Sequence, residues 1–416
     1  MSRAGSEANA EAINAVRTMW TRYHPPGDAR PAWRCLVSFM SLLVACGWMA
    51  SAPTPAPEPA PLAPVAPPTV HERVIVSEAY RIDKKYMSMT GPYGFNDVVL
   101  LDADKPELLW IVGYTTTVVA AEDESELSQE WMCHANLDFD TSVYFEHFPT
   151  APSLSGRVFT LSQGQQDIQF PGGFGVPVTS DLPISLATQV LNLNQPDIDA
   201  TVKHQVTIRY VRDSELQAPL VPMFQSAVEG FKALGDARYY GVEHETHADA
   251  DMLGPGCSVG QAAIAGDVDE DHLGQAFTAH WKVEPGREVN VTNVTRFLNL
   301  PYDTTAHYIA VHLHPFAHSL TLRDLTTGEN VYEAFTRQAE GRVGLDHIDH
   351  YEGADGIPLY KDHEYELVSV YENTTDDVVD SMAVMYLYLR DKRFDKPDLD
   401  RPKFVASAEE PESASM

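Results

Sequence analysis

The chain has 416 residues, of which 44% are hydrophobic, so it carries enough apolar material for globular cores. Its formal net charge is −31, from 60 acidic and 29 basic side chains. A surface this acidic repels nucleic acid and argues against a polyanionic partner, while it attracts cations.

The first 45 residues have the features of a secretion signal. Arg30 and Arg34 precede an apolar run, Cys35 to Ala45, that is too short to span a bilayer. The run ends in Leu43-Val44-Ala45-Cys46, which resembles the lipobox of bacterial lipoproteins, in which the cysteine is lipidated and becomes the N-terminus. An ordinary signal anchor is the alternative. The leader is long, so translation starting at a later methionine such as Met19 is a further expectation.

Residues 46–70 are expected to form a tether behind the lipidated Cys46. Ser51 to Thr69 consists almost entirely of Ala and Pro, a composition typical of an extended, semi-rigid linker without a core. The lipobox resemblance implies a lipid-anchored protein of the bacterial cell envelope, on the periplasmic side or at the outer-membrane surface. Gly47 follows the cysteine where an Asp would retain it, so outer-membrane sorting is expected in a host with two membranes.

Mass spectrometry of the native protein tests this assignment. We expect the mature N-terminus to be a lipid-modified Cys46, because the small residues before it suit the processing site. An unmodified Cys46, or a protein that retains its leader, would contradict the assignment.

Strand patterns dominate residues 71–218. Thr201–Val211 alternates apolar and polar side chains, as expected for a half-buried strand. Five further runs are rich in β-branched or aromatic residues and are separated by Gly, Pro, Asp and Asn clusters. They are Val74–Ser77, Asp97–Leu101, Leu108–Ala120, Phe139–Phe148 and Ser185–Leu193. Many short strands at regular spacing favour an antiparallel β-sandwich.

Residues 219–395 show the same pattern, so we expect a second sandwich that begins near Pro219. Met223–Leu234 suits a short helix at the junction, and the polar segment Gly235–Asp271 suits a long loop. The expected strands are Val283–Asn299, Tyr308–Leu313, Ser319–Leu325, Tyr365–Tyr371 and Met382–Leu389. Residues 396–416 are expected to form a disordered tail. The predicted fold class is therefore all-β, with two tandem sandwich domains behind the signal peptide and the tether.

Two cysteines remain in the globular part. Cys133 and Cys257 form an even pair outside the cytoplasm, which makes a disulfide plausible. Cys133 lies beside His134, so a metal ligand or a free thiol is the alternative interpretation. Spacing alone does not decide between them.

His312 and His314 are the most informative residues of the chain. They alternate with apolar residues in Tyr308–Leu313 and the following His-Pro, so a strand points both imidazoles to one face. Neutral imidazoles are good ligands for copper and zinc. Met382 begins a later predicted strand that could add a thioether. The alternative is a pair of histidines at a strand end whose ring nitrogens are satisfied by the backbone or by water.

The order of Glu284-Pro285-Gly286, His312-Leu313-His314 and Met382–Tyr388 resembles the catalytic domain of the copper type II, ascorbate-dependent monooxygenases. The resemblance implies jelly-roll sandwiches, one copper bound by His312, His314 and Met382, and a substrate pocket lined by Tyr386. It is carried by residues 278–390 and is weak across residues 70–212.

The chain also departs from that family. The family's second, electron-transfer copper uses three histidines, whereas this chain offers His134 with Cys133 beside it and Asn192 in place of the third. One imidazole and an amide do not make a tight copper site. Ala310 replaces the arginine that binds a substrate carboxylate in the peptide-processing members. The resemblance therefore implies one copper per chain and a degenerate first site.

Other polar clusters are weaker candidates. His244-Glu245-Thr246-His247 with Asp249 and Asp251 has ligand spacing but lies in a polar segment, and Asp346–His350 suits a surface loop. Asp267–Asp271 resembles the start of a calcium loop without its glycine. His318 would share the face of His314 if that strand continued through Pro315, as an outer partner of the metal.

Three functional classes fit these features. The first is a copper monooxygenase that hydroxylates a C–H bond with O2 and a small-molecule reductant, and the second is a non-catalytic copper-binding envelope protein. The third is a structural surface lipoprotein on the same scaffold. Copper content separates the third from the others, and O2 consumption with ascorbate separates the first two.

Overall fold

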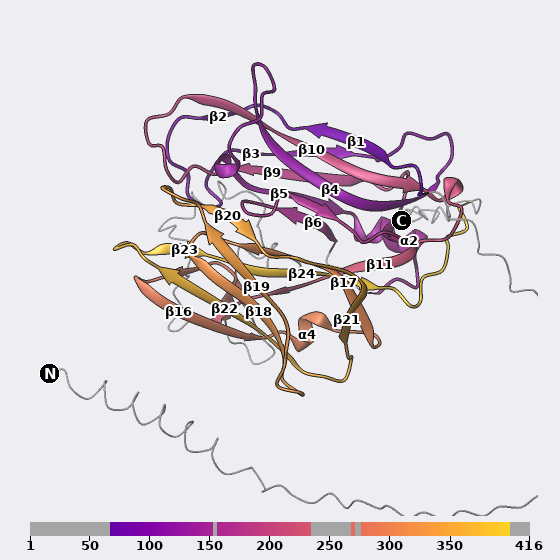
Figure 1. Cartoon of the computed structure of the whole chain (residues 1–416). Helices are drawn as coiled ribbons and strands as arrows, with labels where there is room; N and C mark the ends of the chain where they lie inside the picture. The colour runs from indigo at the N-terminus through magenta and orange to yellow at the C-terminus, as the bar shows by residue number, and fades with distance from the viewer. Residues whose placement is uncertain (1–66, 153–155, 234–267, 271–275, 400–416) are drawn as a thin grey trace, which may run out of the picture. The chain divides into compact units, whose positions relative to one another are not determined.

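The computed structural model describes residues 67–152, 156–233, 268–270 and 276–399, and strands account for most of them (Figure 1). The predicted all-β class with two antiparallel sandwiches is confirmed. The indigo-to-magenta strands of Figure 1 build one body and the orange-to-yellow strands build the other. Among the described residues, no helix is long and apolar enough to cross a membrane.

The N-terminal sandwich packs two sheets over one apolar core. One sheet has the order β1 (His71–Val76), β10 (Ala200–Arg212), β4 (Leu108–Ala120) and β8 (Phe174–Thr179), with β2 (Tyr80–Ile82) on β10 and β7 (Asp167–Gln169) on β4. The other has the order β3 (Tyr93–Val98), β9 (Ile184–Val190), β5 (Met132–Phe139) and β6 (Arg157–Leu161).

The C-terminal sandwich has a second core. One sheet contributes β11 (Val221–Glu229), β24 (Ala383–Arg390), β17 (Thr304–Leu313) and β21 (Tyr351–Leu359), in this order. The other has the order β16 (Gly286–Asn293), β22 (Tyr365–Asn373), β18 (Ala317–Asp324), β19 (Asn330–Gln338) and β20 (Leu345–Ile348). Short strands complete it: β12 (Lys232–Ala233), β13 (Val268–Glu270) and β14 (Ala276–Thr278) in one small sheet, and β15 (Trp281–Val283) with β23 (Val379–Ser381) in another.

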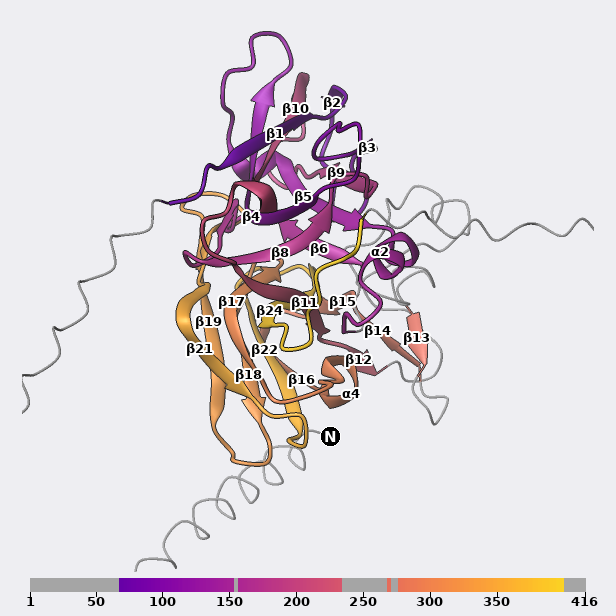
Figure 2. The ribbon, with the colours of Figure 1, turned by 90° about the vertical axis from the view of Figure 1, so that its right-hand side faces the viewer.

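One continuous sheet joins the two sandwiches. A short parallel pairing of β8 with β11 links their first sheets into one sheet of ten strands, and β11 then pairs with β24, as Figure 2 shows. Because side chains alternate along a strand, β17 and β24 present one face to each core. Tyr308, Tyr386 and Tyr388 belong to the N-terminal core, whereas Ile309 and Met385 belong to the C-terminal core.

Two predicted elements are wrong in type. Phe139–Phe148 contains the helix α2 (Thr141–His147) instead of a strand, because the Asp140 carboxylate caps the N–H groups of Ser142 and Val143. Met223–Leu234 begins as the strand β11 and ends in β12 instead of forming a helix, because Met223–Glu229 pairs along its whole length with β24.

Smaller differences between the predicted and the observed elements concern where each element begins and ends. Val283–Asn299 divides into β15, β16 and the one-turn helix α4 (Thr295–Leu298), and the 3₁₀ turns η1 (Gln129–Trp131) and η2 (Asp213–Glu215) flank β5 and β10. The strand β13 lies inside the predicted loop Gly235–Asp271, and the rest of that loop lies outside the described residues. The leader, most of the tether and residues 400–416 also lie outside them.

Candidate metal centre

His312 and His314 lie at the carboxyl end of β17, on the face of the strand that meets the N-terminal sandwich. Both are buried, with 2% and 5% of their surface exposed. Their ring centroids are 5.3 Å apart. Two imidazoles bound to one tetrahedral ion place their centroids about 5 Å apart, given metal–nitrogen distances near 2.0 Å. The two rings therefore have the separation of a shared metal.

Each imidazole is held through its Nδ1 atom. Nδ1 of His312 lies 3.0 Å from the Ser162 hydroxyl. Nδ1 of His314 lies 3.0 Å from the Asp380 carboxylate, a close contact that does not have the geometry of a hydrogen bond. A histidine that donates its Nδ1 proton to such a partner presents the lone pair of Nε2 to a metal, and metal-binding histidines usually have this outer contact. Asp380 lies on β23 and Ser162 follows β6, so the two sandwiches each orient one ligand.

The two Nε2 atoms face different environments. Nε2 of His312 has no hydrogen-bond partner among the described residues, although it is buried. Nε2 of His314 accepts from the Ser88 hydroxyl at 3.3 Å. A buried imidazole nitrogen without a partner is costly unless a ligand satisfies it. The position of His312 Nε2 therefore fits a metal ligand.

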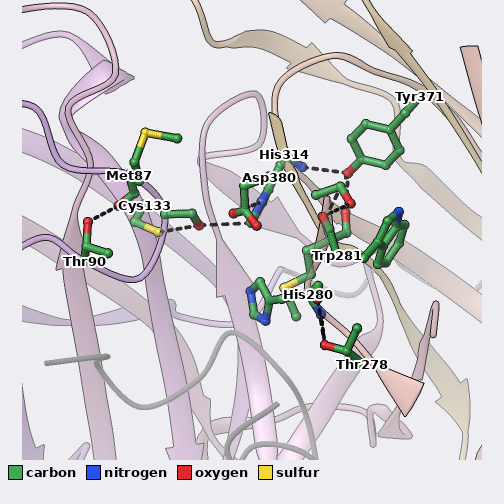
Figure 3. A network of polar contacts seen from close by, with 12 residues as sticks. Met87, Thr90, Cys133, Thr278, His280, Trp281, His314, Tyr371 and Asp380 are labelled. Carbon is green, nitrogen blue, oxygen red and sulfur yellow. Dashed lines mark hydrogen bonds and ion pairs between the residues drawn. The ribbon is translucent and has the colours of Figure 1, made fainter. Parts of the chain in front are cut away.

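Met382 lies beside the histidines and is fully buried. Leu313 pairs with Ala383 across β17 and β24, which sets Met382 opposite His314 on the same face. The Tyr371 hydroxyl fixes this end of the two strands: it accepts from the backbone N–H groups of His314 and Met382 and donates to the Met382 carbonyl (Figure 3). The strand register thus places Met382 beside His314, on the face of the sheet that carries both imidazoles.

His312 is a neutral imidazole at physiological pH. Burial lowers its pKa well below the ordinary value, and the nearby rings of His314, His134 and His280 add to the effect. A neutral imidazole binds a metal without first losing a proton. The His280 ring, whose centroid lies 5.7 Å from that of His314, is a neighbour that the sequence patterns did not reveal.

The residues of the predicted first copper site do not assemble a ligand set. Across the described ranges, no three His, Cys, Asp or Glu side chains lie close enough to hold one ion. Asn192 closes a turn, because its amide donates to the carbonyls of Lys84 and Gln195, both at 2.7 Å. His134 is buried on β5 and interacts electrostatically with both His204 and His312.

A β-bulge displaces Cys133 from the regular pairing of β5 with β9. Met132 pairs with Val190 and His134 with Gln189, so Cys133 is the additional residue. Its side chain lines a cavity of about 80 Å³ together with His312 and His314. The predicted disulfide stays a prediction, because Cys257 lies outside the described residues.

Tyr386 lies deeper than a residue that lines an open pocket. It is fully buried opposite Ala310, and its hydroxyl accepts from Thr160 of the other sandwich at 2.9 Å. Burial raises its pKa to about 12. In this arrangement Tyr386 joins the two sandwiches and does not line the cavity beside the histidines.

Other predicted positions do not join the site. His318 was expected on the face of His314, but a turn at Pro315-Phe316 interrupts the strand, and His318 is exposed against Phe335. Asp346–His350 was expected to be a loop, but β20 covers its first half. Cys46, the His244–Asp251 cluster and the acidic residues Asp267 and Asp271 lie outside the described residues.

The buried His204 makes stability depend on pH. Burial, followed by the neighbouring His134, lowers its pKa to about 4. The unfolded chain takes up this proton near pH 6.5, so the free energy of unfolding falls as pH drops from about 6.5 to about 4 and is constant above this window. We expect His204 to account for a loss of about 2 kcal/mol between pH 7 and pH 5, measured by urea titration. His204→Leu should flatten this dependence, and an unchanged pH slope would contradict the expectation.

Comparison with known proteins yields a likeness of fold only. No protein-family model and no curated protein matches the chain. A crystal structure of peptide-N(4)-(N-acetyl-β-D-glucosaminyl) asparagine amidase aligns at 7% identity, with 78% of this chain and 99% of that chain covered and a TM-score of 0.30. A structure of Sulfolobus turreted icosahedral virus aligns at 10% identity, with 78% and 91% covered and a TM-score of 0.27. PBCV-1 VP54 aligns at 8% identity, with 80% and 97% covered and a TM-score of 0.27. Likenesses this distant carry no argument about function.

Proposed function

We propose that this protein is a copper-binding lipoprotein of the bacterial cell envelope, with His312, His314 and Met382 as the ligands of one copper ion. The observation that carries the proposal is the buried His312 Nε2, which has no hydrogen-bond partner among the described residues and lies beside a second imidazole. The resemblance of the His-x-His strand and the Met382 strand to the copper monooxygenases supports it.

Copper suits this donor set better than other metals. Imidazole binds both copper and zinc, but a thioether is a soft ligand that selects Cu(I). Among the described residues, no third His, Cys, Asp or Glu completes a set with the two histidines, which disfavours a structural zinc site. The roles of the chain's own residues follow: Asp380 and Ser162 orient the rings, and Tyr371 fixes the backbone of two ligands.

Hydroxylation of a C–H bond is the second candidate function. Copper with an open coordination position would supply O2 activation there. The cavity of about 80 Å³ beside the imidazoles favours this candidate, because it holds a small molecule such as O2 next to the proposed ligands. Consumption of O2 with ascorbate, dependent on bound copper, would establish this activity.

Copper titration tests the proposed function. We expect the full-length apoprotein to saturate near one copper per chain, because His134, Cys133 and Asn192 do not replace a three-histidine site. The His312→Ala/His314→Ala double variant should lose tight binding. Tight binding of two ions would show that Cys133 or His134 belongs to a second site, and tight binding by the double variant would overturn the proposed ligands.

A further inference from the structure

Two sulfur-containing residues line the cavity beside the proposed copper ligands. Met87, in the loop after β2, and the bulge residue Cys133 both line it, as do His312 and His314. Figure 3 shows Met87 and Cys133 to one side of His314. Met87 is 50% exposed, whereas Cys133 is 5% exposed. One sulfur is therefore reachable from solvent and the next lies inside the protein.

A single hydroxyl connects the inner sulfur to a proposed ligand. Ser88 Oγ lies 3.7 Å from Cys133 Sγ and 3.3 Å from His314 Nε2. Ser88 follows Met87 directly in the chain, so the loop that carries the exposed thioether also covers the His314 nitrogen. A change of the Ser88 side chain to another staggered rotamer would move its hydroxyl away from both atoms.

The side chains that line the cavity favour the binding of a soft cation. Thiolate and thioether select Cu(I) over divalent ions that prefer oxygen. The Asp380 carboxylate lines the same cavity and adds negative charge beside His314. His312 Nε2, buried and without a hydrogen-bond partner among the described residues, is an independent sign that this cavity receives a ligand.

We propose that Met87 and Cys133 form a capture site for Cu(I), from which the ion passes to His312, His314 and Met382. This inference rests on the proposed function of the histidine site. The capture step requires Cys133 as a thiol, the alternative to its predicted disulfide with Cys257. On capture, the Cys133 S–H bond breaks and a sulfur–copper bond forms, and the proton leaves to solvent. On transfer to the imidazoles the thiol regains a proton, and copper remains Cu(I) throughout.

The test measures how fast the full-length apoprotein takes Cu(I) from a Cu(I)–bicinchoninate complex without oxygen. We expect Met87→Leu to slow transfer about tenfold, equivalent to about 1.4 kcal/mol at the capture step, and to leave the equilibrium Cu(I) affinity unchanged. Cys133→Ser should also slow transfer. Met89→Leu is the matched control, because Met89 lies two residues away, is buried and does not line the cavity; it should load at the wild-type rate.

Two outcomes separate this inference from the proposed function. Wild-type loading rates in both Met87→Leu and Cys133→Ser, with tight Cu(I) binding retained, would overturn the capture site alone. Unweakened Cu(I) binding in the His312→Ala/His314→Ala variant would overturn the proposed function. If both proposals hold, the double variant binds Cu(I) only weakly at the capture site, and X-ray absorption with excess Cu(I) should show sulfur ligands without imidazole scattering.

Discussion

Met382→Leu is expected to lose most of the Cu(I) affinity of the protein while Cu(II) binding falls much less. A thioether contributes substantially to Cu(I) but little to Cu(II), which prefers nitrogen and oxygen ligands. The substitution keeps the volume and apolar character of a fully buried side chain, so the free energy of unfolding should change by less than about 1.5 kcal/mol. Competition titrations with a Cu(I) chelator and with a Cu(II) chelator measure the two affinities.

Met385→Leu is the internal control for this comparison. Met385 lies on the same strand and is equally buried, but it belongs to the C-terminal core, on the opposite face from His314. Its replacement should leave both copper affinities at the wild-type value. Equal losses of Cu(I) affinity in the two variants would defeat the assignment of Met382, and with it the main link to the copper monooxygenases.

Asp380→Asn is expected to weaken copper binding by about 10- to 100-fold, the usual cost of losing an outer partner of a metal-binding histidine. The carboxylate lies 3.0 Å from Nδ1 of His314, where its negative charge favours a proton on that nitrogen. An amide can present its NH₂ group to the same nitrogen and so favour the wrong tautomer. Isothermal titration with copper gives the affinity, and the spectrum of the Cu(II) complex reports a change in the imidazole ligands.

Asp349→Asn provides the comparison. Asp349 also contacts a histidine, His347, at 3.2 Å, but this pair is largely exposed and lies away from the cavity. The variant removes one negative charge from an acidic protein, as Asp380→Asn does, so it controls for the general attraction of cations. A similar loss in both variants would assign the effect to net charge and not to the orientation of His314.

The face of the strand on which each side chain of the site lies could be predicted from periodicity alone. Alternation puts His312 and His314 on one face, and the same rule applied to the later strand puts Met382 and Met385 on opposite faces. The two cores have this arrangement. Asp380 is two residues before Met382, so alternation also indicates that it lies on the same side, although the pattern does not identify its partner.

The remaining parts of the site depend on contacts between distant segments. Ser88 and Ser162 reach the two histidines from more than a hundred residues away, and no local pattern marks a serine as such a partner. His280 is likewise placed by β15, a strand of three residues. The bulge at Cys133 is a tertiary feature, because it exists only in the pairing with β9.

The errors in secondary structure have local causes. Phe139–Phe148 is rich in aromatic residues and suits a strand by composition, but Asp140-Thr141-Ser142 is a helix N-cap signal that outweighs it. Met223–Glu229 directly follows Pro222, and a proline is compatible with the start of either a helix or a strand, so the short apolar run fits both. Pairing with β24 decides it.

The two faces of β17 and β24 have a consequence for folding. Each strand supplies side chains to both cores, so neither half of the chain can complete its own core without the other. A fragment that starts at the second sandwich would expose Tyr308, Tyr386 and Tyr388 to water, and a fragment that ends before it would lack the surface that covers β6. Burial of large aromatic rings dominates core energetics. The described part of the protein should therefore melt as one cooperative unit, in which binding at the histidines stabilises both halves together.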